Sequence, residues 1–81
     1  MPEGRIKELI EYMARALVEH PEEVRVVESS GARSSVYELH VAPSDMGRVI
    51  GKDGRVANAM RSLVRVASAQ AGRRAILEIV E

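Results

Sequence analysis

The chain has 81 residues, enough for one small domain near the lower size at which a hydrophobic core alone stabilises a fold. It has no cysteine, which excludes disulfides and thiolate metal sites, and no apolar run approaches the roughly 20 residues that span a bilayer. The formal charge is zero, but residues 1–44 hold eight acids and five bases, whereas residues 45–81 hold four acids and seven bases. We therefore expect one soluble, cytoplasmic domain over residues 1–81. Its C-terminal half should offer a basic face to an anionic partner, unless these charges are only scattered and solvated.

The first part of the chain predicts a helix followed by a β-hairpin. Apolar residues recur at helical spacing up to Pro21, which should end this helix. Alternation then predicts a strand over residues 22–29, a turn over residues 29–34 and a second strand. The residues of the second strand that share one face are Tyr37, Leu39 and Val41. Two strands joined so closely should pair in antiparallel fashion.

A short helix is expected next. The segment Pro43-Ser44-Asp45 is typical of a helix start, with Ser44 as the N-cap and Asp45 placed favourably against the helix dipole. The helix can run only to about Ile50, because two glycines follow within four residues.

A longer helix is expected from Arg55 to about Gln70, ended by Gly72, and a final strand over residues 75–80. Arg73 and Arg74, just after Gly72, are expected in a solvated turn. The predicted order α-β-β-α-α-β indicates an α+β fold, in which helices pack on a three-stranded sheet because neither kind of element can bury its apolar side alone.

The loop Gly51-Lys52-Asp53-Gly54 carries the chemistry. Glycines permit positive φ and leave the backbone bare, so a phosphate chain can approach closely. The helix beginning at Arg55 points free N–H groups toward the same space, and Lys52 adds a positive charge. The flanking residues that would support the loop are Arg48, Val49, Ile50 and Val56. We interpret the loop as a grip for the backbone of single-stranded nucleic acid, RNA or possibly DNA; a plain helix–helix connection that needs glycine is the alternative.

The loop and its surroundings resemble a known signature. The segment Val49-Ile50-Gly51-Lys52-Asp53-Gly54-Arg55-Val56 is similar to that of the KH domain, whose G-x-x-G loop clamps about four nucleotides of backbone. The element order resembles the type II KH arrangement. Residues 41–52, the segment Asn58-Ala59-Met60-Arg61 and the length of the chain resemble the KhpA family of small bacterial single-KH RNA-binding proteins.

The resemblance implies a function, a site and partners. Members of this family act as RNA chaperone-like regulators that self-associate and pair with a larger KH protein, Jag (KhpB). By position, Gly51, Lys52, Asp53 and Gly54 would form the clamp, supported by Arg48, Val49, Ile50, Arg55 and Val56. Two features weaken the expected binding: Ala57 stands where KH domains often have a bulky aliphatic residue, and Asp53 places a carboxylate in the loop.

The long helix has an apolar arc wider than packing on a sheet requires, and it includes Met60 and Val64. We expect these two residues to meet a second subunit, although alanines tolerated at the surface would also widen the arc. Arg61 and Arg65 share the opposite side, where they either contact phosphates or only solubilise the helix.

Other classes of function fit less well. There is no Phe or Trp, so binding by base stacking on aromatic residues is excluded. Asp53 follows the lysine where a P-loop needs Ser or Thr, and no catalytic relay is recognisable, so we expect no enzyme, no cofactor and no metal. The alternative function is a protein-interaction module that uses the apolar face of the 55–70 helix and binds no nucleic acid.

Overall fold

The computed structural model describes residues 4–81. In chain order the elements are α1 (Gly4–Leu17), β1 (Arg25–Ser30), β2 (Ser34–His40), α2 (Met46–Ile50), α3 (Arg55–Ala71) and β3 (Arg74–Ile79). Short 3-10 turns cover Pro21–Glu23, Pro43–Asp45 and Lys52–Gly54. The predicted order α-β-β-α-α-β and the α+β, type II KH-like fold class are confirmed. Within residues 4–81 no helix combines the length and the apolar character needed to cross a membrane.

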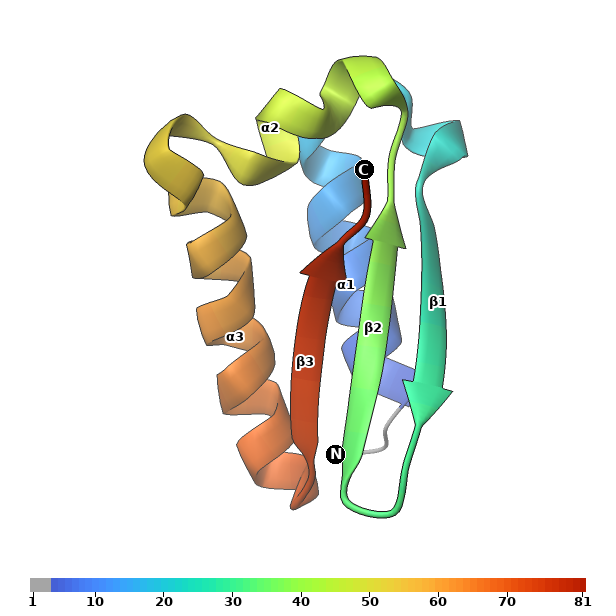
Figure 1. Cartoon of the computed structure of the whole chain (residues 1–81), viewed down its shortest axis with the longest axis vertical. Coiled ribbons are helices and arrows are strands. Elements are labelled where there is room, and N and C mark those ends of the chain that lie inside the picture. Colours follow the sequence, from blue (N-terminus) through green and yellow to red (C-terminus); the bar gives the residue numbers. More distant parts are fainter. Residues whose placement is uncertain (1–3) are drawn as a thin grey trace.

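The three strands form one mixed sheet in the order β1-β2-β3. β1 and β2 pair in antiparallel fashion, as predicted for a hairpin, whereas β3 runs parallel to β2. β1 begins at Arg25 rather than at residue 22, because the proline at position 21 starts a 3-10 turn before the strand. A parallel pair needs a long crossover connection, and α2 and α3 supply it. α3 runs beside β3 and α1 lies behind the sheet in the view of Figure 1.

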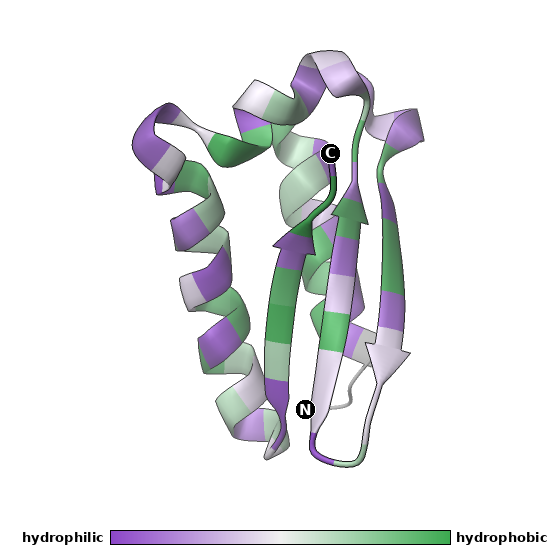
Figure 2. Ribbon diagram, in the orientation of Figure 1, coloured by the Kyte–Doolittle hydropathy of each residue, from purple (hydrophilic) through white to green (hydrophobic). Residues whose placement is uncertain are grey.

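The core lies between the sheet and the two long helices. Its buried residues are Ile6, Ile10, Ala14, Val24, Val26, Tyr37, Leu39, Met60, Val64, Ala67 and Leu77. Along β2, Tyr37 and Leu39 face the helices, as predicted, and Val41 packs against the core from just beyond the strand. Figure 2 shows hydrophobic and hydrophilic bands along β2. The helices therefore cover one face of the sheet and leave the other face open.

Arg73 forms hydrogen bonds with the protein backbone, whereas the sequence predicted that it would lie in a solvated turn. Its Nη2 donates hydrogen bonds to the carbonyl oxygens of Gly31 and Ser34 at 2.8 and 3.2 Å, and to Oγ of Ser35 at 3.3 Å. The turn after α3 is thereby fixed to the β1–β2 turn. Its neighbour Arg74 is exposed, but it is the first residue of β3 rather than part of the turn that the sequence had predicted.

Candidate nucleic-acid interface

The loop between α2 and α3 has an unusual backbone. Gly51, Asp53 and Gly54 all have positive φ, at 74°, 56° and 76°. The amide of Gly54 donates to the carbonyl of Gly51 at 3.2 Å, which closes the loop into a tight 3-10 turn. Figure 2 shows the loop as a hydrophilic band between hydrophobic residues of α2 and α3. The chain therefore presents bare backbone to solvent at the junction of two helices, as the sequence predicted.

The two glycines are required for different reasons. A Cβ on Gly51 would lie 2.4 Å from Cγ2 of Val56. The backbone of Gly51, with φ 74° and ψ 174°, also lies in a region that only glycine occupies readily. A Cβ on Gly54 would meet nothing closer than Nδ2 of Asn58 at 3.9 Å. Gly51 therefore lets the backbone pass close to the start of α3, whereas Gly54 supplies a left-handed turn and leaves open space beside it.

Positive groups converge on this space. Lys52 and Arg55 are exposed, and within residues 4–81 neither side chain forms an ion pair or a hydrogen bond. No side chain caps the N-terminus of α3, although the amides of Gly54 and Arg55 already donate to the carbonyl oxygens of Gly51 and Lys52 within the turn. Asp53 is also exposed, which places one negative charge among them. The arrangement suits a single phosphate group or a short run of phosphates.

Arg48 has a different environment. It lies on α2, where its guanidinium contacts Oε1 of Glu19 at 3.0 Å and Oδ1 of Asp45 at 3.7 Å. The sequence analysis placed Arg48 among the residues that support the loop, and in the structure two acids engage its charge. The apolar supports lie as expected: Val49 is fully buried, and Ile50 and Val56 are half-buried beside the loop. Ala57 is buried as well and is not part of an open groove wall.

Asp45 anchors α2, a role that sequence patterns missed. Ser44 does not cap α2. It lies in the 3-10 turn that precedes this helix, and the N-terminus of α2 has no side-chain cap. The fully buried Asp45 carboxylate instead accepts hydrogen bonds from the backbone amides of Glu19 and His20, both at 3.0 Å. It therefore joins the start of α2 to the segment that follows α1, 25 to 26 residues earlier in the chain.

The hydrogen bonds to Asp45 also affect its titration. The Glu19 amide is the main cause that lowers the pKa of this carboxyl below its ordinary value of 3.8, while burial acts in the opposite direction. The His20 amide lowers the pKa further, and so do the charges of His20 and Arg48. The His20 ring lies close enough to contribute, with Nδ1 at 3.2 Å from Oδ2 of the carboxylate. Asp45 is therefore held in its ionised form.

The predicted subunit interface needs a correction. Met60 and Val64 are only 3% and 1% exposed, because α1 and the sheet cover the side of α3 on which they lie. The large apolar residues that α1 and α3 do expose are Tyr12, Leu63 and Val66. An apolar groove of about 310 Å³ runs between α1 and α3, with Leu17, Val56 and Leu63 among its lining residues. The apolar arc on α3 is wide, as predicted, but Met60 and Val64 belong to its buried part, whereas Leu63 and Val66 form its exposed part.

Among residues 4–81 no group of three or more His, Cys, Asp or Glu side chains is placed to hold a metal ion.

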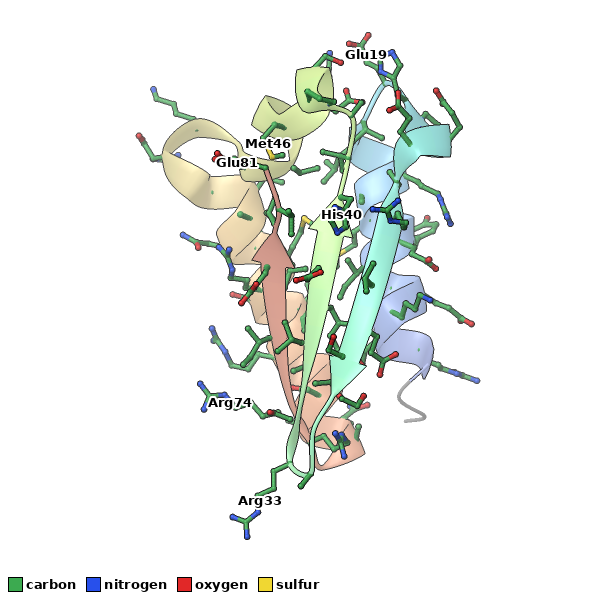
Figure 3. All side chains as sticks on the ribbon, turned by 45° about the vertical axis from the view of Figure 1, so that its right-hand side comes forward. Glu19, Arg33, His40, Met46, Arg74 and Glu81 are labelled. Carbon is green, nitrogen blue, oxygen red and sulfur yellow. The ribbon has the colours of Figure 1, made fainter. Side chains whose placement is uncertain are left out.

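Figure 3 shows the two ends of the molecule. Glu19 and Met46 lie at the end that carries α2, and Arg33 and Arg74 lie toward the opposite end. The candidate interface therefore lies at one end of the molecule, where α2 meets α3.

Comparison with known proteins gives consistent matches. The profile of the family described as KhpA/KhpB, KH domain, matches residues 7–79. The chain is 45% identical over 75 residues to RNA-binding protein KhpA of Clostridium acetobutylicum, covering 93% of this chain and 100% of that protein. It is 49% identical over 76 residues to RNA-binding protein KhpA of Halalkalibacterium halodurans, covering 94% and 100%.

A solved structure is similar in fold. A crystal structure of Era in complex with MgGDPNP and nucleotides 1506–1542 of 16S ribosomal RNA matches with a TM-score of 0.66 at 22% identity. The match covers 91% of this chain but only 28% of the Era chain. At that identity the similarity concerns the fold of one part of Era.

Proposed function

The chain belongs to the KhpA/KhpB family of KH domains, and on that basis we propose that it binds single-stranded RNA by gripping the sugar–phosphate backbone at the Gly51–Gly54 loop. The observation that carries the proposal is the meeting of bare glycine backbone, an uncapped helix N-terminus and two unpaired cations at one exposed turn. RNA is the proposed ligand because the relatives are named RNA-binding proteins.

Each residue of the site has a proposed part. Gly54 lets a phosphate approach the positive end of the α3 dipole, and Lys52 and Arg55 neutralise its charge. Gly51 sets the path of the loop against Val56. Arg48, Val49 and Ile50 act as support, since they hold α2 in place through an ion pair and through packing. Asp53 turns the loop with its left-handed backbone but repels phosphate, which limits affinity.

The grip should be modest and tolerant of sequence. The chain has two tyrosines; Tyr37 lies in the core, and Tyr12 lies on α1 beside the apolar groove. Tyr37 is therefore closed to a base, and contacts to phosphate carry no sequence information directly. A weak, sequence-tolerant grip that binds and releases RNA readily fits a chaperone-like regulator.

Replacing Lys52 tests the clamp. We expect Lys52→Asp to weaken binding of a fluorescently labelled single-stranded RNA by about tenfold, because it removes one phosphate contact and adds a repulsive charge. Fluorescence anisotropy measures the affinity. The slope of log K against log salt concentration should become shallower by roughly 0.7 for each phosphate that the variant no longer neutralises.

Lys7→Asp is the matched control. It makes the same change near the start of α1, which lies at the opposite end of the molecule from the loop (Figure 1). It should therefore leave the affinity for RNA near that of the wild type. Equal affinities for Lys52→Asp and Lys7→Asp would contradict the clamp. Absence of RNA binding by the wild type would favour the protein-interaction module instead.

We also propose that the protein self-associates through the exposed apolar residues of α1 and α3. Leu63 and Val66 are 53% and 62% exposed on one helix, and the adjoining groove is lined almost entirely by apolar side chains. A second copy of the chain offers the same patch, which suits a two-fold contact. A larger KH-containing partner of the Jag (KhpB) type would compete for the same surface.

Leu63→Glu should shift the protein toward monomer, because it places a charge in the proposed contact. Sedimentation velocity over a series of concentrations measures the shift. Asn58→Glu, at an exposed position on another side of α3, is the control and should keep the wild-type behaviour. A wild-type protein that is monomeric at every concentration, or a dimer unaffected by Leu63→Glu, would reject this surface.

A further inference from the structure

The apolar groove between α1 and α3 and the Gly51–Gly54 loop share one residue. Val56, the second residue of α3, lines the groove together with Leu17 and Leu63. The same side chain packs against the loop, since a Cβ on Gly51 would collide with its Cγ2. Figure 1 shows the reason: the loop leads directly into the first turn of α3. A molecule that lies in the groove therefore contacts the residue on which the loop rests.

The shape of the loop depends on such support. Asp53 has a φ of 56°, which costs free energy for a residue that carries a side chain. The hydrogen bond from the amide of Gly54 to the carbonyl oxygen of Gly51 stays within the turn itself. The packing of Gly51 on Val56 adds a contact between the turn and α3. Val56 is only half-buried, so part of its surface is left for an occupant of the groove to cover.

The opposite wall of the groove is tied to α2. Leu17 is the last residue of α1, and the amides of Glu19 and His20 just beyond it donate to the buried carboxylate of Asp45, both at 3.0 Å. Asp45 directly precedes α2, which ends at the loop. These hydrogen bonds oppose a movement of α1 away from α2. An occupant of the groove therefore packs between a fixed wall on α1 and the side chains of α3, Val56 among them.

We infer that self-association in the apolar groove and RNA binding at the loop are coupled, so that each strengthens the other. The occupant is a second copy of the chain, whose side chains cover the exposed part of Val56 and hold it against Gly51. The loop then keeps the shape that grips the RNA backbone, and less free energy is spent on ordering it when RNA binds. This inference rests on the proposed function, because it concerns the regulation of the same loop.

Coupling between two sites is reciprocal, and this gives a quantitative expectation. Association should raise the affinity of each loop for RNA by about fivefold, the lower end of the usual range for coupled sites. A dimer carries two loops, so saturating RNA should strengthen the dimer by the square of that factor, about 25-fold. A substitution that only disturbs the fold would not make these two independent measurements agree.

A short RNA tests the coupling. A labelled single-stranded RNA of about four nucleotides occupies one loop and is too short to bridge two. Fluorescence anisotropy compares the wild type, above its dimer dissociation constant, with Leu63→Gln, which weakens the contact without adding a charge. The wild type should bind the RNA about fivefold more tightly. Sedimentation velocity of the wild type, with and without saturating unlabelled RNA, then measures the dimer dissociation constant.

Variants of Val56 test whether this side chain carries the coupling. Val56→Ala removes the shared contact and should bring both factors close to one. Val56→Ile keeps a β-branched side chain and should retain both factors. Thermal melts of each variant check that the fold is intact. The comparison of the wild type with Leu63→Gln does not depend on how well Val56→Ala folds.

The outcomes separate the coupling from the clamp. Equal RNA affinities for the wild type and Leu63→Gln, or a dimer that RNA does not strengthen, would reject the coupling while the clamp stands. A wild type that stays monomeric at every concentration, with and without RNA, would also reject it. Full coupling in a well-folded Val56→Ala would overturn the role of this residue. Absence of RNA binding by every variant and by the wild type would contradict the clamp, and the coupling with it.

Discussion

Gly51→Ala should lower the free energy of unfolding by about 3 kcal/mol or more, a large part of the stability of a domain of this size. The substitution adds a side chain at φ 74° and ψ 174°, and its Cβ would approach Cγ2 of Val56 to 2.4 Å and the backbone nitrogen of Val56 to 2.9 Å. The start of α3 would have to move, and it carries the proposed phosphate contacts. Urea denaturation followed by circular dichroism measures the loss.

Two other glycines serve as controls for this prediction. Gly54→Ala should cost only about 1 kcal/mol, because the left-handed conformation is strained but the space beside it is open. Gly47→Ala, inside α2 with nothing within 4 Å of the new Cβ, should raise stability by about 0.5–1 kcal/mol through helix propensity. A loss for Gly51→Ala no greater than that for Gly54→Ala would contradict the close contact with Val56.

Asp45→Asn should lower the melting temperature by on the order of 10 °C, although the two side chains have nearly the same shape. The carboxylate accepts from two backbone amides, of Glu19 and His20, through its two oxygens. Asparagine has only one carbonyl oxygen, so one of the two amides would face an NH2 group. Asp53→Asn, at an exposed position of the loop, is the control and should melt near the wild type.

The same substitution should change how stability depends on pH. Because the folded pKa of Asp45 lies below its ordinary value of 3.8, its contribution is complete above that value and is lost as pH falls through the lower folded pKa. Wild-type stability should therefore decline with acid more steeply than that of Asp45→Asn over this range. Melting curves at a series of pH values below about 4 test this, and parallel curves for the two proteins would refute it.

The regular elements were predictable because their signals are local. Helical periodicity, the prolines and the double glycine give the order of elements, and the fold follows from burying the apolar sides. The start of β1 was wrong by three residues, since alternation of Val24 with charged neighbours does not distinguish a strand from the 3-10 turn that Pro21 starts. The parallel pairing of β3 with β2 was not predicted, because it depends on the path that α2 and α3 take between the two strands.

The contacts that sequence reasoning missed join residues far apart in the chain. Asp45 resembled a helix-start residue, and only the folded chain brings it to the amides after α1. Arg73 resembled a turn residue, but its partners lie about 40 residues earlier. Met60 and Val64 belong to a wide apolar arc, and periodicity gives its width without showing which part α1 covers. The loop was predictable because its glycines and cations are adjacent in sequence.

The place of the loop in the chain would couple the proposed RNA capture to the completion of folding. The hairpin of β1 and β2 is local, whereas β3 can pair with β2 only after the whole crossover through α2, the loop and α3 has closed. The loop lies inside that crossover. A ligand that binds only the closed form stabilises it by mass action, about 2.7 kcal/mol at a hundredfold excess over Kd. RNA bound at the loop would therefore disfavour reopening of the part of the domain with the longest-range contacts.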